Sequence, residues 1–92
     1  MAKFNITERR AKAVLNALRL LFIRKGQLTA DEAGPTLIMD WDWLGTGPAP
    51  AIVWEEGPYE WAIERSMELQ KVISPRVFVE PITSWSLGIY PA

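Results

Sequence analysis

The sequence predicts a small α+β domain in which an antiparallel sheet of about three strands carries two helices on one face. Two segments, residues 7–26 and 57–75, repeat their apolar side chains at helical spacing. The segments between and after them are rich in β-branched and aromatic side chains and are bounded by Gly-Pro turn signals. The expected order is therefore helix, strand, strand, helix, strand, in a single domain spanning residues 1–92.

The first helix has a clear start and a clear end. Thr7 is a good N-cap, and Gly26 is placed to end the helix in a left-handed conformation. The expected inward stripe follows the i, i+3, i+4, i+7 spacing and consists of Ala11, Val14, Leu15, Leu18, Leu21 and Phe22. Beyond this helix, the capping-box spacing from Thr29 to Glu32 predicts a single further helical turn.

Three segments are expected to form the sheet. Residues 36–44 and residues 51–56 read as two strands joined by a turn, and residues 76–90 read as one long or bent strand. Pro81 or Gly88 would mark a bulge or an edge position in that last strand. The side chains expected to meet the helices are Leu37, Met39, Trp41, Trp43, Val53, Val77 and Val79.

The second helix is expected to begin at Pro58, because a proline at the first helical position loses no hydrogen bond. Ser74 and Pro75 end it. Its expected inward stripe consists of Tyr59, Ala62, Ile63, Ser66, Leu69, Gln70 and Ile73.

The composition argues against catalysis. The chain has no histidine and no cysteine, which removes the commonest acid–base side chain and metal ligand and every thiolate. We therefore expect a non-enzymatic protein without a cofactor. The apolar run LRLLFI contains Arg19 and is far too short to span a bilayer, and the N-terminus does not resemble a secretory signal. A cytoplasmic protein is expected.

Charge is strongly segregated along the chain. Residues 1–25 contain seven of the ten basic side chains and one of the eleven acidic ones, which leaves residues 26–92 acidic. Three basic side chains, Arg9, Lys12 and Arg19, lie along one flank of the first helix. Such spacing suits phosphate neutralisation by a nucleic-acid-binding protein. A solvated face that balances acidic residues elsewhere in the fold has the same spacing, and this reading is favoured because no helix-turn-helix, RRM or KH signature accompanies the basic flank.

Two apolar features lie outside the expected core stripes. Trp61 points away from the stripe of the second helix, close to Arg65 and Val72, so it either folds over Trp54 or anchors a protein partner. On the first helix, the strip of side chains opposite the expected core is partly apolar, and its members are Leu20 and Ile23, with Ala13 and Ala17 nearby. A second apolar strip predicts either a central helix or a subunit interface, and the small size of the domain favours the interface.

Two groups of acidic residues could have a function. Asp40 and Asp42 share one strand face, and Glu55 and Glu56 end the neighbouring strand, so the four could hold Mg²⁺ or Ca²⁺. Outward aspartates are also usual on a solvated edge, and we predict no metal site. The second group, the row Glu60, Glu64 and Glu68, serves either solubility or a basic partner, such as the first helix of another copy.

The segment VWEEGPYEWA, in a tryptophan-rich chain of this length, resembles small uncharacterised proteins encoded by bacteriophages of actinobacteria. This resemblance implies a protein that binds a host or phage protein, and it carries over no catalytic or binding residues. The predicted function is therefore a non-enzymatic, self-associating, protein-binding accessory protein. The alternative is a nucleic-acid-binding protein that uses the basic flank of the first helix.

Overall fold

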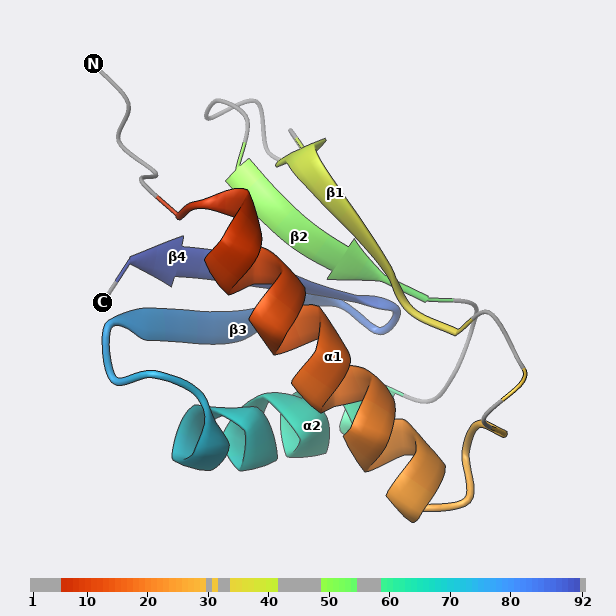
Figure 1. Cartoon of the computed structure of the whole chain (residues 1–92). Helices are drawn as coiled ribbons and strands as arrows, with labels where there is room; N and C mark the ends of the chain where they lie inside the picture. Colours follow the sequence, from red (N-terminus) through yellow and green to blue (C-terminus); the bar gives the residue numbers. More distant parts are fainter. Residues whose placement is uncertain (1–5, 30, 32–33, 42–48, 55–58, 92) are drawn as a thin grey trace.

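The structure, a computed structural model, describes residues 6–29, 31, 34–41, 49–54 and 59–91. The fold is α+β, with two helices and one four-stranded sheet (Figure 1). The elements are α1 (Glu8–Arg24), β1 (Thr36–Trp41), β2 (Ala49–Val53), α2 (Tyr59–Val72), β3 (Val77–Thr83) and β4 (Ser86–Pro91). Neither helix of this described part has the length and apolar character that crossing a bilayer requires.

Both ends of α1 lie where the sequence predicts them. The Thr7 hydroxyl accepts a hydrogen bond from the backbone N–H of Arg10 at 3.2 Å, which satisfies a donor that the first turn leaves free. At the other end, Gly26 has a φ of 72°, and the N–H of Gln27 donates to the carbonyl of Phe22 at 2.9 Å. Only glycine adopts this left-handed geometry at little cost, so Gly26 fixes the direction in which the chain leaves α1.

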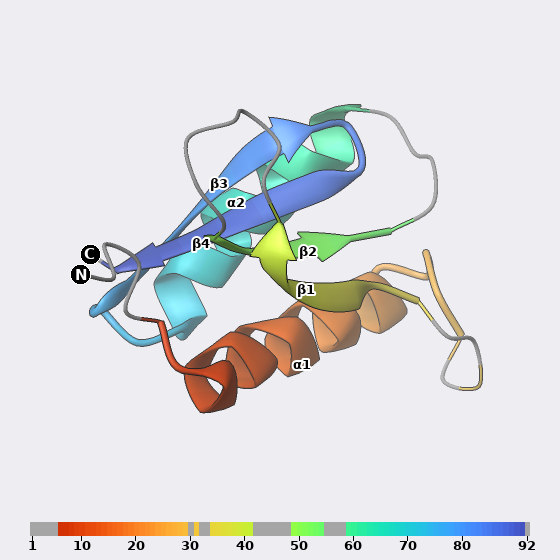
Figure 2. The ribbon, with the colours of Figure 1, turned by 90° about the horizontal axis from the view of Figure 1, so that it is seen from above.

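The sheet has the strand order β1-β2-β4-β3, and every neighbouring pair is antiparallel. Both helices cover the same face of it, as the two ribbon views show (Figures 1 and 2). The core lies between the helices and this face. Its fully buried large apolar side chains are Val14, Leu18, Ile52, Leu69, Val77, Leu87 and Ile89.

The last part of the chain forms two strands, so the prediction of one long strand over residues 76–90 is wrong. β3 and β4 pair as a hairpin whose turn is Ser84-Trp85. Hydroxyl groups hold this turn, because the backbone N–H of Trp85 donates to Thr83 Oγ1 at 3.1 Å and the Thr83 and Ser86 hydroxyls lie 2.6 Å apart. Ser and Thr side chains can stabilise turns in this way without glycine. Pro81 does mark an irregularity, since the pairing register shifts just after it.

The register decides which strand residues meet the helices. Leu37, Ile52 and Leu87 are partners across three strands, so their side chains lie on one face, and Ile52 and Leu87 are fully buried there. Leu37, Met39, Val77 and Val79 contact the core as predicted. Val53 does not, because its neighbour Ile52 takes the inward position and alternation turns Val53 to the other face. The Trp41 side chain and Trp43 lie outside the described residues.

Helix α2 presents a different face to the core than predicted. Ala62, Ser66 and Leu69 are buried as expected, but Arg65 is buried with them and Ile63 is exposed. The buried face is thus displaced toward Arg65. Gln70, also predicted to face inward, is exposed but reaches the backbone of β3 with its amide group. That amide donates to the carbonyl of residue 77 at 2.8 Å and accepts from the N–H of residue 79 at 3.0 Å.

The sheet face away from the helices carries an aromatic pair. The rings of Phe78 and Tyr90 lie 6.4 Å apart, and a Cβ at Gly88 would come within 2.8 Å of the Tyr90 ring. Glycine at residue 88 lets the Tyr90 ring lie across the strand, and a larger residue there would push the ring aside.

The segment after α1 contains a local side-chain contact where a helical turn was predicted. The Thr29 hydroxyl donates to the Asp31 carboxylate at 2.7 Å, and this hydrogen bond lowers the pKa of Asp31. Glu32, the predicted capping-box partner, lies outside the described residues.

Candidate functional site

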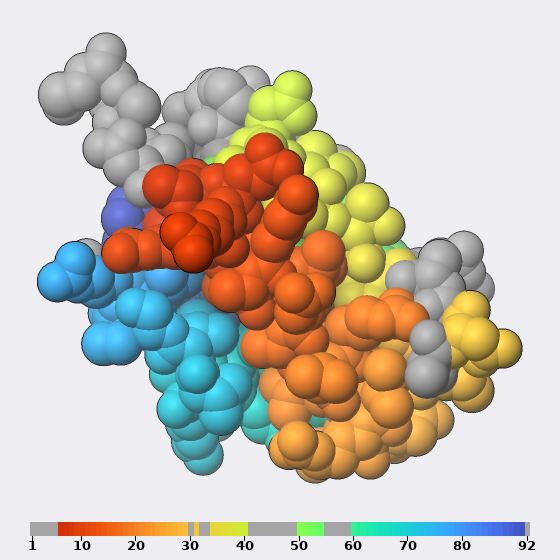
Figure 3. Space-filling view, in the orientation of Figure 1, coloured from red at the N-terminus to blue at the C-terminus, as the bar shows by residue number. Residues whose placement is uncertain are grey.

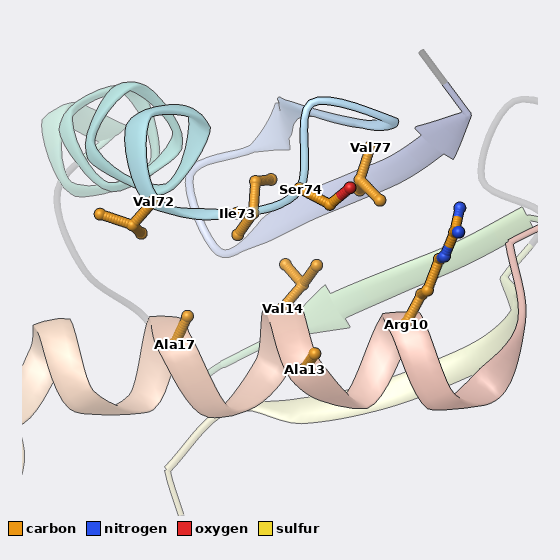
Figure 4. A pocket seen from close by; sticks show the side chains of 8 residues that line it. All are labelled: Arg10, Ala13, Val14, Ala17, Val72, Ile73, Ser74 and Val77. Carbon is orange, nitrogen blue, oxygen red and sulfur yellow. The ribbon is translucent and has the colours of Figure 1, made fainter.

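An apolar groove of about 190 Å³ lies between α1, the end of α2 and the start of β3. Figure 4 shows α1 lying lengthwise and α2 nearly end-on, so the two helices cross and diverge from each other. On the α1 side, two alanines are too small to fill the space that opens between the diverging helices. The groove is lined by Arg10, Ala13, Val14, Ala17, Val72, Ile73, Ser74 and Val77.

Two large apolar side chains stand in solvent beside this groove. Leu20 continues the α1 row formed by Ala13 and Ala17, and 60% of it is exposed. Val72, on the opposite side, is 67% exposed and lines the groove itself. The space-filling view shows the surfaces of α1, α2 and the start of β3 meeting on this side of the molecule (Figure 3). We call this surface, with Leu20, the α1–α2 groove.

The charge around the groove is positive. Arg10 lines one end of it, with Arg9 beside it, and Arg24 follows Leu20 by one helical turn. All three are exposed, and within the described part of the chain none of their side chains forms an ion pair. Arg9 and Arg10 lie in the first turn of α1, where the helix dipole disfavours positive charge. Their placement is thus not explained by the stability of the helix.

A buried arginine ties the C-terminal end of α1 to α2. Only 3% of Arg65 is exposed, and its guanidinium donates to the Gln27 side chain at 3.1 Å. It also forms ion pairs with Glu64 at 3.2 Å and with Glu68 at 2.5 Å. The Nε–H of Arg65 does not point at the Glu68 oxygen, so this second contact is an ion pair without hydrogen-bond geometry. Lys25 adds a contact to Glu68 at 3.3 Å.

The prediction that Arg65 belongs to a partner-binding surface is therefore wrong. The Arg65 side chain makes its ion pairs and its hydrogen bond within the fold, because a buried guanidinium requires such partners.

Trp61 packs on the protein instead of pointing into solvent. Its ring centroid lies 6.1 Å from that of Phe22, and Trp54 contacts the same Phe22 ring edge-on at 5.4 Å. Trp61 is partly buried against the core, so its ring folds back on the protein as one of the two alternatives expects, although the aromatic contact is with Phe22. The displacement of the buried face of α2 toward Arg65 accounts for this position.

The remaining predicted partner-binding residues differ in accessibility. Leu20 and Val72 are exposed; Val72 lines the groove, and Leu20 follows the groove residue Ala17 by one helical turn. Ile23 is half-buried. Of the five predicted residues, Leu20 and Val72 are thus the two that are mostly accessible.

The predicted phosphate-binding flank is partly engaged in contacts of its own. Lys12 forms an exposed ion pair with Glu8 at 3.0 Å. The Arg19 guanidinium lies against Gly34, where a Cβ would come within 2.9 Å of it. Arg9 is exposed and has no ion pair among the described residues.

The structure describes one of the four carboxylates that were considered as metal ligands. Asp40 is exposed on β1, and Asp42, Glu55 and Glu56 lie outside the described residues. Within the described ranges, no three acidic, histidine or cysteine side chains gather closely enough to hold a metal ion.

Two exposed apolar side chains of α2 were missed by the sequence analysis. Ile63 was assigned to the inward stripe, and Met67 was not singled out, yet they are 38% and 61% exposed. A helical wheel does place Met67 among Glu60, Glu64 and Lys71, which is a signal that could have identified it.

Comparisons of the chain with protein-family models, curated proteins and solved structures found no match.

Proposed function

We propose that this protein is a non-enzymatic, cytoplasmic protein-binding module that associates with itself and acts on a phage or host protein. The α1–α2 groove is the binding surface of this proposal. One observation carries it: Val72 lines an apolar groove and is mostly exposed, and the exposed Leu20 follows Ala17 of that groove by one helical turn. Large apolar side chains clustered around a concave surface are typical of protein interaction sites. The resemblance to small phage proteins supports the same class of function.

The groove gives the proposal an energetic basis. Full burial of a valine or leucine side chain stabilises a complex by about 1.5–3 kcal/mol. Because Leu20 and Val72 are already partly covered, we expect each to contribute about 1–2 kcal/mol on binding. The alanine row of α1 lets a partner side chain approach the helix backbone closely.

Sedimentation velocity over a range of concentrations tests this proposal with Leu20→Glu. Leu20 is exposed, so we expect this variant to fold normally. The sedimentation coefficient of the wild type should rise with concentration, and that of Leu20→Glu should stay at the monomer value. Asn16→Glu is the matched control, because Asn16 is an exposed α1 residue outside the groove. Equal behaviour of the two variants would reject the groove as the binding surface.

Nucleic-acid binding is the alternative. The observation that favours it is the exposure of Arg9, Arg10 and Lys12 at the start of α1. A titration with labelled single- and double-stranded DNA at two salt concentrations distinguishes the two functions. Binding that weakens steeply with salt and is lost in Lys12→Glu would support the alternative. Absence of binding at low salt would leave the groove as the interaction surface.

A further inference from the structure

Helix α2 carries a second exposed apolar surface, which lies outside the α1–α2 groove. Ile63 and Met67 are four residues apart, so they are neighbours on the helix surface, and Met67 is the more exposed of the two. Glu60 and Glu64 lie beside them and are also exposed. We call these four residues the α2 ridge. It is an apolar strip with an acidic flank toward the start of α2, and Lys71 lies at its other end.

The ridge and the groove are complementary in charge and shape. The groove is concave and apolar, with Arg10 lining one end and Arg9 next to it, whereas the ridge is convex and apolar with two glutamates. The Glu64 carboxylate contacts Arg65 but remains largely exposed, so it can also face a second cation. A volume of about 190 Å³ is below the roughly 300–1,000 Å³ of small-molecule pockets, which favours one or two inserted side chains over a ligand.

We infer that the α1–α2 groove of one copy receives the α2 ridge of a second copy. This inference rests on the proposed function and specifies its partner surface. Met67, unbranched and flexible, would enter the groove between Ala17 and Val72, and Glu60 or Glu64 would face the arginines at the start of α1.

Such a contact joins two different surfaces of the protein. The ridge and the Val72 side of α2 lie on different faces of the helix, and only the Val72 side borders the groove. One copy can therefore use its groove and its ridge at the same time. We infer that each surface meets a different neighbour, because the two surfaces face different directions; the contact is then heterologous, and the copies assemble head to tail into rings or chains larger than a dimer.

Two variants separate the two surfaces. Met67→Glu places a negative charge on the ridge, and Val72→Glu places one in the groove. Both positions are exposed, so both variants should fold. We expect each to weaken self-association at least about tenfold, a change that corresponds to 1.4 kcal/mol. Asn16→Glu again controls for the added negative charge. Far-UV circular dichroism checks that each variant is folded.

The decisive measurement mixes the two variants in equal amounts. Met67→Glu keeps an intact groove and Val72→Glu keeps an intact ridge, so one productive contact remains between them. Light scattering should give a complex of about twice the 10.4 kDa chain mass that does not grow further. The wild type should exceed a dimer at high concentration, and added salt should weaken its association.

The outcomes distinguish this inference from the proposed function. If the wild type associates and Leu20→Glu abolishes association, while Met67→Glu associates normally, the groove binds another surface and the ridge inference is wrong. A mixture that remains monomeric beside an associating wild type would also overturn the inference. A wild type that is monomeric at all concentrations would overturn the inference and the self-association that it specifies.

Discussion

Replacing Glu68 by Gln removes a negative charge beside the buried Arg65 and keeps the size of the side chain. The Arg65 guanidinium, 3% exposed, then retains only Gln27 and the exposed Glu64 as partners. Removing one partner of a fully buried ion pair costs about 3–5 kcal/mol. The Glu68 side chain is 31% exposed, and Glu64 remains, so we expect a smaller loss of about 2–3 kcal/mol. For a domain of this length, that loss lowers the Tm by about 10–20 °C.

Urea titration measures this loss directly. Tryptophan fluorescence is a suitable probe, because Trp54 and Trp61 both pack on Phe22 near the end of α1. Glu64→Gln is the control: its carboxylate is exposed, so we expect a loss below about 0.5 kcal/mol.

A double variant tests the cause of the effect. Arg65→Met in the Glu68→Gln background removes the buried charge that has lost its Glu68 partner and fills the space with an apolar side chain, so it should recover part of the lost stability. If Glu68→Gln costs no more than Glu64→Gln, or if the double variant is less stable than Glu68→Gln alone, the ion pair does not stabilise the fold as argued.

Two further predictions concern other parts of the fold. Gly26→Ala should lower the free energy of unfolding by about 1 kcal/mol, because alanine is strained at a φ of 72° although no atom blocks its Cβ. Urea titration measures this loss, and an unfolding midpoint equal to that of the wild type would contradict the prediction. Burial raises the pKa of Tyr90, and the charge of Glu80 raises it further. The folded state therefore holds this proton more tightly than the unfolded state, and stability should fall as the pH rises above about 10. Tyr90→Phe should show a smaller loss in unfolding titrations between about pH 9 and about pH 11, and equal losses would refute the assignment.

The parts of the fold that local signals specify were predictable. α1 has a capping threonine, a terminal glycine and one apolar stripe, and all three signals agree. The β3–β4 hairpin was missed because its turn, Ser84-Trp85, contains no glycine, proline, asparagine or aspartate. The Thr83 hydroxyl stabilises this turn by accepting a hydrogen bond from Trp85. Turn prediction from residue types alone does not take such a bond into account.

The site was only partly predictable, because it depends on tertiary packing. Leu20 and Val72 were recognisable as apolar side chains outside the core stripes. Arg65, by contrast, reads as a surface residue that pairs with Glu68 one turn along α2, until the fold buries it and brings Gln27 to it. The groove itself follows from how the two helices diverge, which no local pattern determines.

The amide of Gln70 has a consequence for how copies of this chain can meet. The outer edge of β3 would otherwise present free backbone groups, to which a strand of another molecule could add. Gln70 occupies the carbonyl of Val77 and the N–H of Val79 with a donor and an acceptor, much as a neighbouring peptide unit would. Pro81, further along the same strand, has no N–H to offer. The edge of β3 is therefore less open to a strand from another molecule, and a contact made through the helices would not extend the sheet across molecules.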